Sequence, residues 1–357
     1  MFVFFAKHPG SNPNQGMHHR ILAIDNIVRD KERKYVHVSF FKNLRRKITQ
    51  IDAKTTQYEF NFFIHFFIIN KILSNASIIY IHTIINGLKA CLLFNKKTVL
   101  TILDAHGVVP EESKMNNEVI KKHVFSLAEK MCFRKVDYII HVSNAMKEHF
   151  DNKYSNRKNR DIILPIFGKM PEHKSINANA NEHDYILFCY VGGTQKWQNF
   201  DDVFAFAINT ASPNYRFHFM IPSTDIKKYI EMIPQSIKEY IIINNGGRNE
   251  VYDLLQRADF GFLLRDDVLV NNVACPTKAI EYLHFDVIPI VKNNHIGDLN
   301  VYGVETLLFS NMECVYMGQL NFEKITKHNK LAYKKMLDDT NKAILELKSI
   351  YDERSDY

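Results

Sequence analysis

The sequence predicts an α/β protein made of two successive domains, each a parallel sheet with crossover helices. Its 357 residues are too many for one ordinary core and suit two domains of this type. A hydrophobic content of 46%, with only 13 glycines and 10 prolines, describes a packed globular chain. Short apolar runs also alternate with helical patterns along both halves, which is typical of parallel sheets.

The first half begins this alternation at its first residues. Strands are expected at 2–6, 77–82, 98–103, 138–142 and 162–165. Helices are expected at 17–28, 58–73, 85–94, 117–133 and 144–150. Ser143 is placed to cap the last of these helices, and the stretch after residue 28 is basic and irregular. The pattern predicts a first domain over residues 1–166.

The second half repeats the alternation after a polar stretch. Residues 167–183 lose apolar periodicity and are expected to form the interdomain linker. Strands are expected at 185–191, 216–221, 240–243, 260–264 and 288–291, with helices at 199–210, 225–233, 250–258 and after Pro276. This gives a second domain over 184–325, followed by a helical segment at 326–357 with Ile344, Leu347 and Tyr351 on one face. Two successive Rossmann-like lobes are expected to face each other across a cleft.

The net charge of +7 and a pI near 8.9 predict an anionic partner. Part of the excess lies at residues 42–47, beside Phe40 and Phe41. Such a cluster suits either the surface of an acidic membrane or a solvated face. Nucleic acid is not expected, because the chain has no recognisable binding module.

Cysteine usage and apolar segments indicate the compartment. The five cysteines are widely spaced and mostly within apolar runs, which predicts reduced core residues of a cytoplasmic protein. The amino terminus has no leading cations and no cleavage site, so it is expected to form a strand and not a signal peptide. The longest apolar stretch, 62–69, is too short to cross a bilayer.

The segment 259–291 gives the clearest indication of a binding site in the sequence. An apolar strand ends in Arg265, and a helix begins just after Pro276 with Lys278 in its first turn. Cations and free backbone N–H groups therefore meet at the carboxyl end of a sheet, where a phosphate binds well. Glu281, one turn further, can accept hydrogen bonds from ribose hydroxyls. The segment predicts a site for a nucleoside diphosphate.

A second candidate loop, 192–196, follows a strand and precedes a helix. Gly192 and Gly193 allow a sharp turn close to a ligand, and Lys196 adds a positive charge. A tight turn with a solvated lysine explains the same residues. The spacing fits neither a Walker loop nor the dinucleotide fingerprint.

The first half has two further candidate segments. Asp104 and His106 end a strand, with Glu111 and Glu112 just beyond, so His106 can bond a substrate hydroxyl or carry a proton. A capped turn with a backbone-bonded histidine is the alternative. The 8–20 loop has Gly16 for close backbone approach and Arg20 for an anion or a carboxylate, and a surface loop is its alternative.

The sequence predicts no metal and no other cofactor. No Asp-x-Asp pair stands at a strand end, and His18 and His19 lack further ligands at useful spacing. The acidic pairs at 201–202, 266–267 and 338–339 lie where capping or solvated roles suffice. The charge of a diphosphate would then be met by lysine, arginine and helix dipoles.

Several of these motifs together resemble a family. Gly-Gly-x-x-Lys at 192–196 and Pro-x-Lys-x-x-Glu-Tyr-Leu at 276–283, followed by Ile-Pro-Ile-Val, are similar to the GT-B glycosyltransferases, in particular glycosyltransferase family 4. The segments DAHGVVPEE and LLRDDxxVNxVAxPTK resemble bacterial enzymes that build lipopolysaccharide, O-antigen or capsule. The resemblance covers most of the chain and is weaker over 31–75.

The resemblance implies retaining transfer from a nucleotide-diphosphate sugar to a lipid-linked glycan acceptor, in the cytoplasm or on the inner face of the bacterial plasma membrane. The second lobe would bind the nucleotide sugar, the first lobe would bind the acceptor, and the carboxy-terminal helix would cross back to the first lobe. The residues expected to carry catalysis are His106, Lys196, Arg265 and Glu281. The residues expected to bind the donor are Gly16, Gly192, Gly193, Lys196, Arg265, Thr277, Lys278 and Glu281. The acceptor side would comprise Asp104, His106 and Glu112.

Two positions depart from the family pattern. The family often has an earlier glutamate where this chain has Val273, so contacts to the distal sugar hydroxyls are expected from Asn271, Asn272 or backbone N–H groups. Trp197 stands where a glycine commonly follows the lysine. The alternatives to a transferase are a nucleotide-sugar epimerase of the same fold and a non-catalytic nucleotide-binding subunit of a glycan assembly complex.

Overall fold

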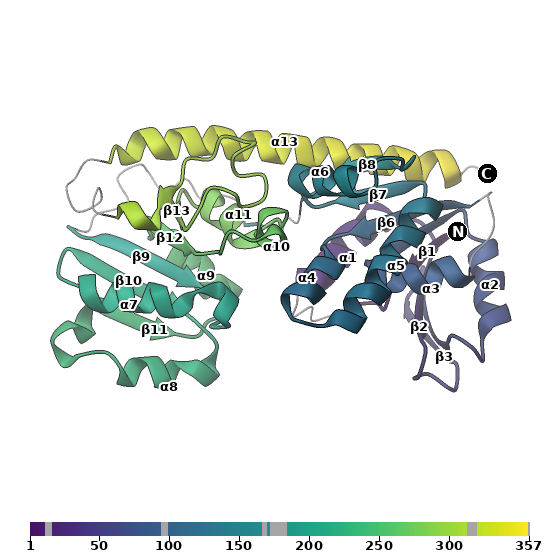
Figure 1. The fold of residues 1–357 in the computed structure, drawn as a ribbon, viewed down its shortest axis with the longest axis horizontal. Coiled ribbons are helices and arrows are strands. Elements are labelled where there is room, and N and C mark those ends of the chain that lie inside the picture. Colours follow the sequence, from purple (N-terminus) through teal and green to yellow (C-terminus); the bar gives the residue numbers. More distant parts are fainter. Residues whose placement is uncertain (11–15, 94–98, 166–169, 172–183, 313–319, 356–357) are drawn as a thin grey trace. The chain divides into compact units, whose positions relative to one another are not determined.

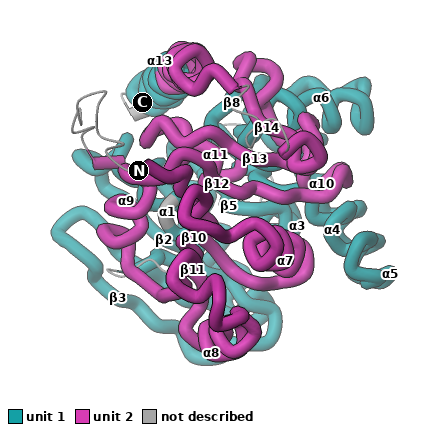
Figure 2. Tube along the Cα trace, turned by 90° about the vertical axis from the view of Figure 1, so that its left-hand side faces the viewer, with its two compact units in different colours: residues 1–168, 273–275, 338–357 teal, residues 169–272, 276–337 magenta. Residues whose placement is uncertain are grey.

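The chain divides into two compact units. The computed structural model describes residues 1–10, 16–93, 99–165, 170–171, 184–312 and 320–355. Unit 1 comprises residues 1–168, 273–275 and 338–357, and unit 2 comprises residues 169–272 and 276–337 (Figure 2). The α/β class and the two parallel-sheet lobes are therefore confirmed.

Unit 1 contains an eight-stranded sheet in the order β3-β4-β2-β1-β5-β6-β7-β8. Its strands are β1 (Phe2–Phe5), β2 (Arg33–Ser39), β3 (Lys47–Asp52), β4 (Thr55–Asn61), β5 (Ile78–His82), β6 (Leu100–Ala105), β7 (Tyr138–His141) and β8 (Arg160–Ile163). Figure 1 labels β1, β2, β3, β6, β7 and β8 of this sheet. All neighbours pair in parallel except β3 and β4. Such a parallel sheet needs helical crossovers.

Those crossovers are mostly at the predicted positions. The helices of unit 1 are α1 (Gly16–Ile27), α2 (Phe66–Ser74), α3 (Ile84–Leu93), α4 (Val109–Met115), α5 (Val119–Lys135) and α6 (Asn144–Lys153). The Ser143 side chain accepts a hydrogen bond from the Met146 backbone N–H at 3.0 Å, so the predicted cap of α6 is confirmed.

Two predictions in unit 1 are wrong, and one helix was not predicted. Residues 58–61, predicted as helix, belong to strand β4, where β-branched and aromatic residues pair with β2 along its full length. The stretch after residue 28 contains β2 and not irregular chain, because it pairs in parallel with both β1 and β4. Buried Arg33 at its start is neutralised by Asp25 at 3.2 Å. A separate helix, α4, precedes α5, since Pro110 fits a first helical turn.

Unit 2 contains a six-stranded parallel sheet in the order β11-β10-β9-β12-β13-β14. Its strands are β9 (Ile186–Val191), β10 (Tyr215–Met220), β11 (Ile241–Asn244), β12 (Phe260–Leu263), β13 (Ile288–Val291) and β14 (Leu307–Leu308). Its helices include α7 (Phe200–Thr210), α8 (Ser223–Glu231), α9 (Arg248–Leu255), α10 (Leu269–Asn272) and α11 (Thr277–His284). Phe188 stacks between Phe217 and Phe260 at ring-centroid distances of 5.0 and 5.3 Å, so aromatic residues form the centre of this core.

The last helix, α13 (Phe322–Ser355), is the longest of the described elements. Its residues from 338 onward belong to unit 1, where Ala343, Leu347 and Tyr351 enter the core. The Tyr351 ring meets the Phe2 ring edge to face at 5.1 Å. Within the described ranges, no helix combines the length and apolar character that a membrane crossing requires.

Candidate functional site

The carboxyl edge of the unit 2 sheet brings the predicted phosphate-binding segments together. The strand order reverses between β9 and β12, which lie side by side in the centre of the sheet. Loops that follow such neighbouring strands diverge and leave a crevice for a ligand. Gly192 follows β9, and Arg265 follows β12 by two residues. The predicted helix after Pro276 is confirmed as α11.

Lys278, in the first turn of α11, lies against the Gly192 loop. Its Nζ donates a hydrogen bond to Gln198 Oε1 at 3.1 Å and lies 4.4 Å from the centroid of the Tyr190 ring. A Cβ atom at Gly192 would lie 2.1 Å from this Nζ, and the φ angle of Gly192 is +149°. Glycine is therefore required here for the backbone conformation, and its lack of a side chain leaves the space that the end of the lysine occupies.

Arg265 is held by an aromatic ring. Its guanidinium carbon lies 4.1 Å from the centroid of the Trp197 ring, a close cation–π contact. Trp197 is 48% exposed, so one part of the ring holds the arginine while the rest faces solvent. The tryptophan that departs from the family pattern thus positions one of the predicted site residues.

Neither of these two cations is in direct contact with a carboxylate among the described residues. Burial, together with the charge of neighbouring Arg265, lowers the pKa of Lys278 to about 7, although Glu281 acts to raise it. Burial also lowers the pKa of Arg265 to about 10. In the part of the chain that the structure describes, no ion pair joins either side chain to a carboxylate. Two close, partly dehydrated cations of this kind favour binding of an anion.

Glu281 lies within electrostatic range of Lys278 and of a residue that the sequence did not reveal. Burial raises the pKa of the Glu281 carboxyl, while Arg248 and Lys278 lower it. Arg248 is the first residue of α9 and follows Gly246 and Gly247, just beyond β11. The sequence signal that could have identified Arg248 is the pair of glycines that precedes it at a junction between a strand and a helix.

The other predicted donor residues have different surroundings. Lys196 is exposed at the start of a short 3-10 turn, next to Trp197, and its side chain makes no ion pair within the described ranges. Thr277 is exposed at the start of α11. The Gly193 carbonyl accepts a hydrogen bond from the Tyr190 hydroxyl, which fixes the loop. The side chains of Asn271 and Asn272 bond within their own loop, to the Asp266 carbonyl and to Asp267 at 2.8 and 2.7 Å.

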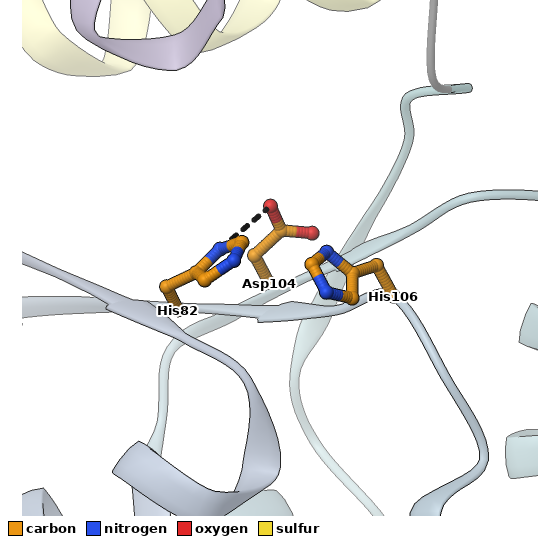
Figure 3. Close-up of side chains that lie close together, drawn as sticks. All are labelled: His82, Asp104 and His106. Carbon is orange, nitrogen blue, oxygen red and sulfur yellow. Dashed lines mark ion pairs between the residues drawn. The ribbon is translucent and has the colours of Figure 1, made fainter. Parts of the chain in front are cut away.

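Unit 1 places two histidines beside a buried aspartate (Figure 3). His82 and Asp104 are register partners on β5 and β6, and His106 follows β6 directly. His82 Nδ1 lies 3.8 Å from Asp104 Oδ2, and the two histidine rings meet edge to face at 4.5 Å. His82 was not among the predicted residues, although it ends a predicted strand.

Asp104 is an ionised anchor for this group. Arg20 donates from Nε and Nη2 to its two oxygens at 2.9 and 3.1 Å, and the Tyr80 hydroxyl also donates to Oδ2. Burial would raise the pKa of Asp104, but Arg20, His82 and His106 hold it well below its usual range. The predicted role of Arg20 as a carboxylate partner is confirmed.

His106 keeps free hydrogen-bonding capacity. Burial lowers its pKa to about 4, so the ring is neutral near pH 7. Its Nδ1 and the Nε2 of His82 are buried and have no hydrogen-bond partner among the described residues. A neutral imidazole with an open ring nitrogen can bond a hydroxyl of a ligand.

The same three side chains fit a metal ion poorly. One potential ligand atom from each of His82, Asp104 and His106 lies within 4.8 Å of the others. However, both carboxylate oxygens of Asp104 already accept hydrogen bonds from the Arg20 cation. A second cation beside that fixed charge would be repelled.

Two further predicted residues lie in unit 1. Glu112, on α4, is close to the loop of His106, because a Cβ at Gly107 would lie 2.9 Å from its Oε1. Burial and the charge of Glu111 raise the pKa of Glu112. Glu111 instead pairs with Lys153 at 2.7 Å. Gly16 is the first residue of α1, and the loop residues 11–15 before it lie outside the described ranges.

Comparison of the sequence with known proteins finds one distant relative among the curated proteins. No family model matches the chain. An uncharacterized glycosyltransferase of Methanocaldococcus jannaschii is 23% identical over 187 residues, which is 51% of this chain and 41% of that protein. The chain therefore spans less than half the length of this curated relative.

Solved structures match over nearly the whole chain. Sucrose-phosphate synthase from Thermosynechococcus elongatus has a TM-score of 0.66 and 10% identity, covering 99% of this chain and 98% of that one. The E. coli trehalose-6-phosphate structure bound with UDP-2-fluoro glucose has a TM-score of 0.65 and 11% identity, covering 99% of this chain and 98% of that one. The pneumococcal O-GlcNAc transferase GtfA in complex with UDP and GlcNAc has a TM-score of 0.58 and 11% identity, covering 86% of this chain and 62% of that one.

These similar structures establish the fold of the chain but not the family to which it belongs. Sugar-phosphate synthases are prominent among them, so membership of glycosyltransferase family 4 and a role in bacterial surface glycans stay predictions. The two parallel-sheet units and the similar solved structures together give the conclusion that the chain has the GT-B fold of glycosyltransferases.

Proposed function

We propose that the protein is a retaining glycosyltransferase that uses a nucleotide-diphosphate sugar as donor. The observation that carries this proposal is the pair of partly dehydrated cations, Arg265 and Lys278, at the carboxyl edge of the unit 2 sheet. Two adjacent phosphates match two adjacent cations and the free N–H groups at the start of α11. Glu281 supplies an acceptor for ribose hydroxyls on the same helix.

In the proposed reaction, the bond between the anomeric carbon and the diphosphate oxygen breaks while the acceptor oxygen bonds to the same face of that carbon. The leaving diphosphate gains negative charge, which Lys278, Arg265 and the α11 amino terminus stabilise. The acceptor hydroxyl loses its proton to the departing phosphate oxygen. Donors fixed before the reaction make such stabilisation effective, because they need no reorganisation.

The remaining predicted residues have supporting roles in this proposal. Exposed Lys196 approaches the diphosphate from the Gly192–Gly193 loop, Thr277 donates to it, and Gly16 lies by the phosphates. In unit 1, His106 bonds a hydroxyl of the transferred sugar through its open ring nitrogen, and Asp104 and Glu112 serve the acceptor side. No metal takes part, since protein cations meet the phosphate charge, and EDTA should leave turnover unchanged.

A panel of nucleotide sugars tests the donor site. Ligands that bind the native state raise its melting temperature in proportion to affinity, so the panel identifies the nucleotide and the sugar. Lys196→Ala should lower transfer to a glycan acceptor far more than it lowers the melting temperature, with exposed Lys227→Ala as the matched control. Sugar inversion without an acceptor would indicate an epimerase, and binding without turnover on any glycan would indicate a non-catalytic subunit.

We further propose that the acceptor is a lipid-linked bacterial surface glycan and that unit 1 contacts an anionic membrane from the cytoplasmic side. The support is an aromatic-basic surface, defined as residues 40–47 and 62–71. Within it, Phe41, Phe63 and Phe67 are 88%, 67% and 84% exposed. The Phe40 ring joins the two segments, with its centroid 6.0 Å from that of Phe63.

The charge of this surface supports an anionic partner. Its cations are Lys42, Arg45, Arg46, Lys47 and Lys71, and neither segment contains an acidic residue. Lys47 pairs with Glu59 of strand β4 at 3.8 Å. Exposed aromatic rings beside a cluster of cations suit the headgroup region of an anionic bilayer. A polar acceptor glycan carried on a lipid would then be presented to the enzyme at that surface.

Vesicle sedimentation tests this membrane contact. The protein should bind vesicles that contain phosphatidylglycerol and should be released by high salt. Phe41→Ser combined with Phe67→Ser should weaken binding, whereas Leu331→Ser with Leu345→Ser, two leucines each 65% exposed on α13, should not. Equal binding of both double variants would refute the assignment of this surface.

A further inference from the structure

Unit 1 has a cavity of about 790 Å³ at the amino end of its sheet. Leu100, Tyr138 and Arg160, the first residues of β6, β7 and β8, all line it. The last turns of α5 and α13 complete the wall. A volume of this size accommodates a small-molecule ligand.

The cavity is strongly basic. Eight lysines and arginines line it, against only two acids, Asp137 and Glu353. Asp137 is already engaged, because it accepts hydrogen bonds from the backbone N–H and the hydroxyl of Thr101, both at 2.8 Å. Such an imbalance around one hollow favours an anionic ligand.

Some of these cations are neutralised and others are not. Lys153 pairs with Glu111 and Glu129 at 2.7 and 2.5 Å, and Arg157 pairs with Asp151 and Asp161. Lys135 donates a hydrogen bond to the Cys91 carbonyl at 2.8 Å. The other five cations make no ion pair to a carboxylate within the described ranges: Lys130, Arg134, Lys158, Arg160 and Arg354. These five side chains are exposed, so they can reach a ligand without leaving another charge unpaired.

Helix dipoles explain only part of this charge. Lys130, Arg134 and Arg354 lie near the carboxyl ends of α5 and α13, where cations are favourable in any protein. A helix dipole does not explain the positions of Lys158 and Arg160. Lys158 lies between α6 and β8, and Arg160 is the first residue of β8. Arg160 is also held in place, donating to the Tyr138 hydroxyl at 2.8 Å.

The cavity is separate from the residues of unit 1 assigned to catalysis. Leu100 begins β6, whereas Asp104 and His106 lie at its other end. Six residues of strand set these ends about 17 Å apart. A ligand bound at the amino end therefore does not occupy the histidine site.

We propose that this cavity is a second anion site, which binds a ligand that carries two or more phosphates. Arg134 and Lys158 contact the phosphates from α5 and from the segment before β8. Phe133, Val136 and Tyr138 form the apolar floor beneath them. A free polyphosphate and the headgroup of an anionic lipid share this chemistry.

Calorimetric titration of the full chain with inorganic tripolyphosphate tests the proposal. Arg134→Gln with Lys158→Gln should weaken binding at this site by about tenfold or more, because each lost charged contact is worth on the order of a factor of ten. The control, Lys227→Gln with Lys238→Gln, removes the same charge from unit 2 and should not change it. Arg265→Gln with Lys278→Met removes the donor site, so any tripolyphosphate binding that this variant retains belongs to the cavity.

The outcomes separate this proposal from the proposed activity. Unchanged tripolyphosphate affinity in the Arg134/Lys158 variant, with an unchanged melting temperature, would overturn the second site even if nucleotide sugar still binds. Loss of tripolyphosphate binding with intact nucleotide-sugar binding supports it. Vesicles that contain cardiolipin, whose headgroup carries two phosphates, then identify the source. If a headgroup is the ligand, the Phe41→Ser/Phe67→Ser variant still binds them and tripolyphosphate displaces it; if the ligand is a free polyphosphate, neither occurs.

Discussion

A Cβ atom at Gly192 would lie 2.1 Å from the Nζ of Lys278, so the glycine loop after β9 and the first turn of α11 are mutually dependent. The loop provides space for the lysine, and the lysine brings positive charge to the loop. This relationship links two motifs that are separated by more than eighty residues of sequence. It also makes the proposed donor site open to direct tests.

Gly192→Ala should displace the Lys278 ammonium and weaken nucleotide-sugar binding by about tenfold, which corresponds to about 1.4 kcal/mol. Gly303→Ala is the matched control, because Gly303 also has a positive φ of +73° but its Cβ would meet only His328 Nε2, at 3.7 Å. Calorimetry on both variants measures the difference. Equal affinities would show that Lys278 does not depend on this glycine.

Lys278→Met should lower turnover by about 10²–10³-fold, since it removes a fixed charge from the leaving diphosphate. The melting temperature should stay the same or rise, because a buried cation without a carboxylate partner is replaced by an apolar side chain of similar length. Steady-state kinetics measures the expected loss of turnover, and thermal unfolding measures the expected melting temperature. A fall in stability with unchanged turnover would assign Lys278 a structural role.

Binding of a nucleoside diphosphate near neutral pH should be accompanied by proton uptake. Lys278 has a pKa of about 7 in the free protein, and a bound anion raises that pKa, so the partly deprotonated amine gains a proton. Affinity should fall as the pH rises above 7. Calorimetry in buffers of different ionisation enthalpy measures the number of protons, and a value of zero at pH 7.5 would contradict this assignment.

Arg20→Met should destabilise the fold by about 3–5 kcal/mol, because it leaves the Asp104 carboxylate buried without its partner. Arg20 is 2% exposed and Asp104 is fully buried. Lys31→Met is the control, since the side chains of the Lys31–Asp352 ion pair are 32% and 52% exposed and the pair should be worth less than about 1 kcal/mol. Urea unfolding of both variants gives the comparison.

His106 should make stability depend on pH between about 4 and 6.5. Its pKa is about 4 in the fold and 6.5 when unperturbed, so in this window the unfolded chain binds more protons than the folded one. The free energy of unfolding should therefore rise with pH, by on the order of 3 kcal/mol across the window. His106→Gln should flatten the profile there, and an equally steep profile in this variant would exclude His106 as the cause.

The sequence alone was sufficient for the fold class, and it nominated several candidate site residues. Alternating apolar runs determine parallel sheets, and a glycine loop or a basic residue after a strand predicts where a ligand approaches. Arg265, Lys278 and Glu281 could be predicted because they lie on one strand–loop–helix segment, within about twenty residues. A carboxylate was one of the partners expected for Arg20, but its identity as Asp104 came only from the structure.

Only the tertiary structure decided what surrounds these residues. Trp197 over Arg265, Arg248 near Glu281 and His82 opposite Asp104 are contacts between separate loops or strands. Strand β4 was taken for a helix because an aromatic run has no decisive period by itself, and its pairing with β2 determines its conformation. The physical reason is common to all of them: strand order brings distant loops to one edge of a sheet, and burial there alters charges that local sequence would leave at their ordinary values.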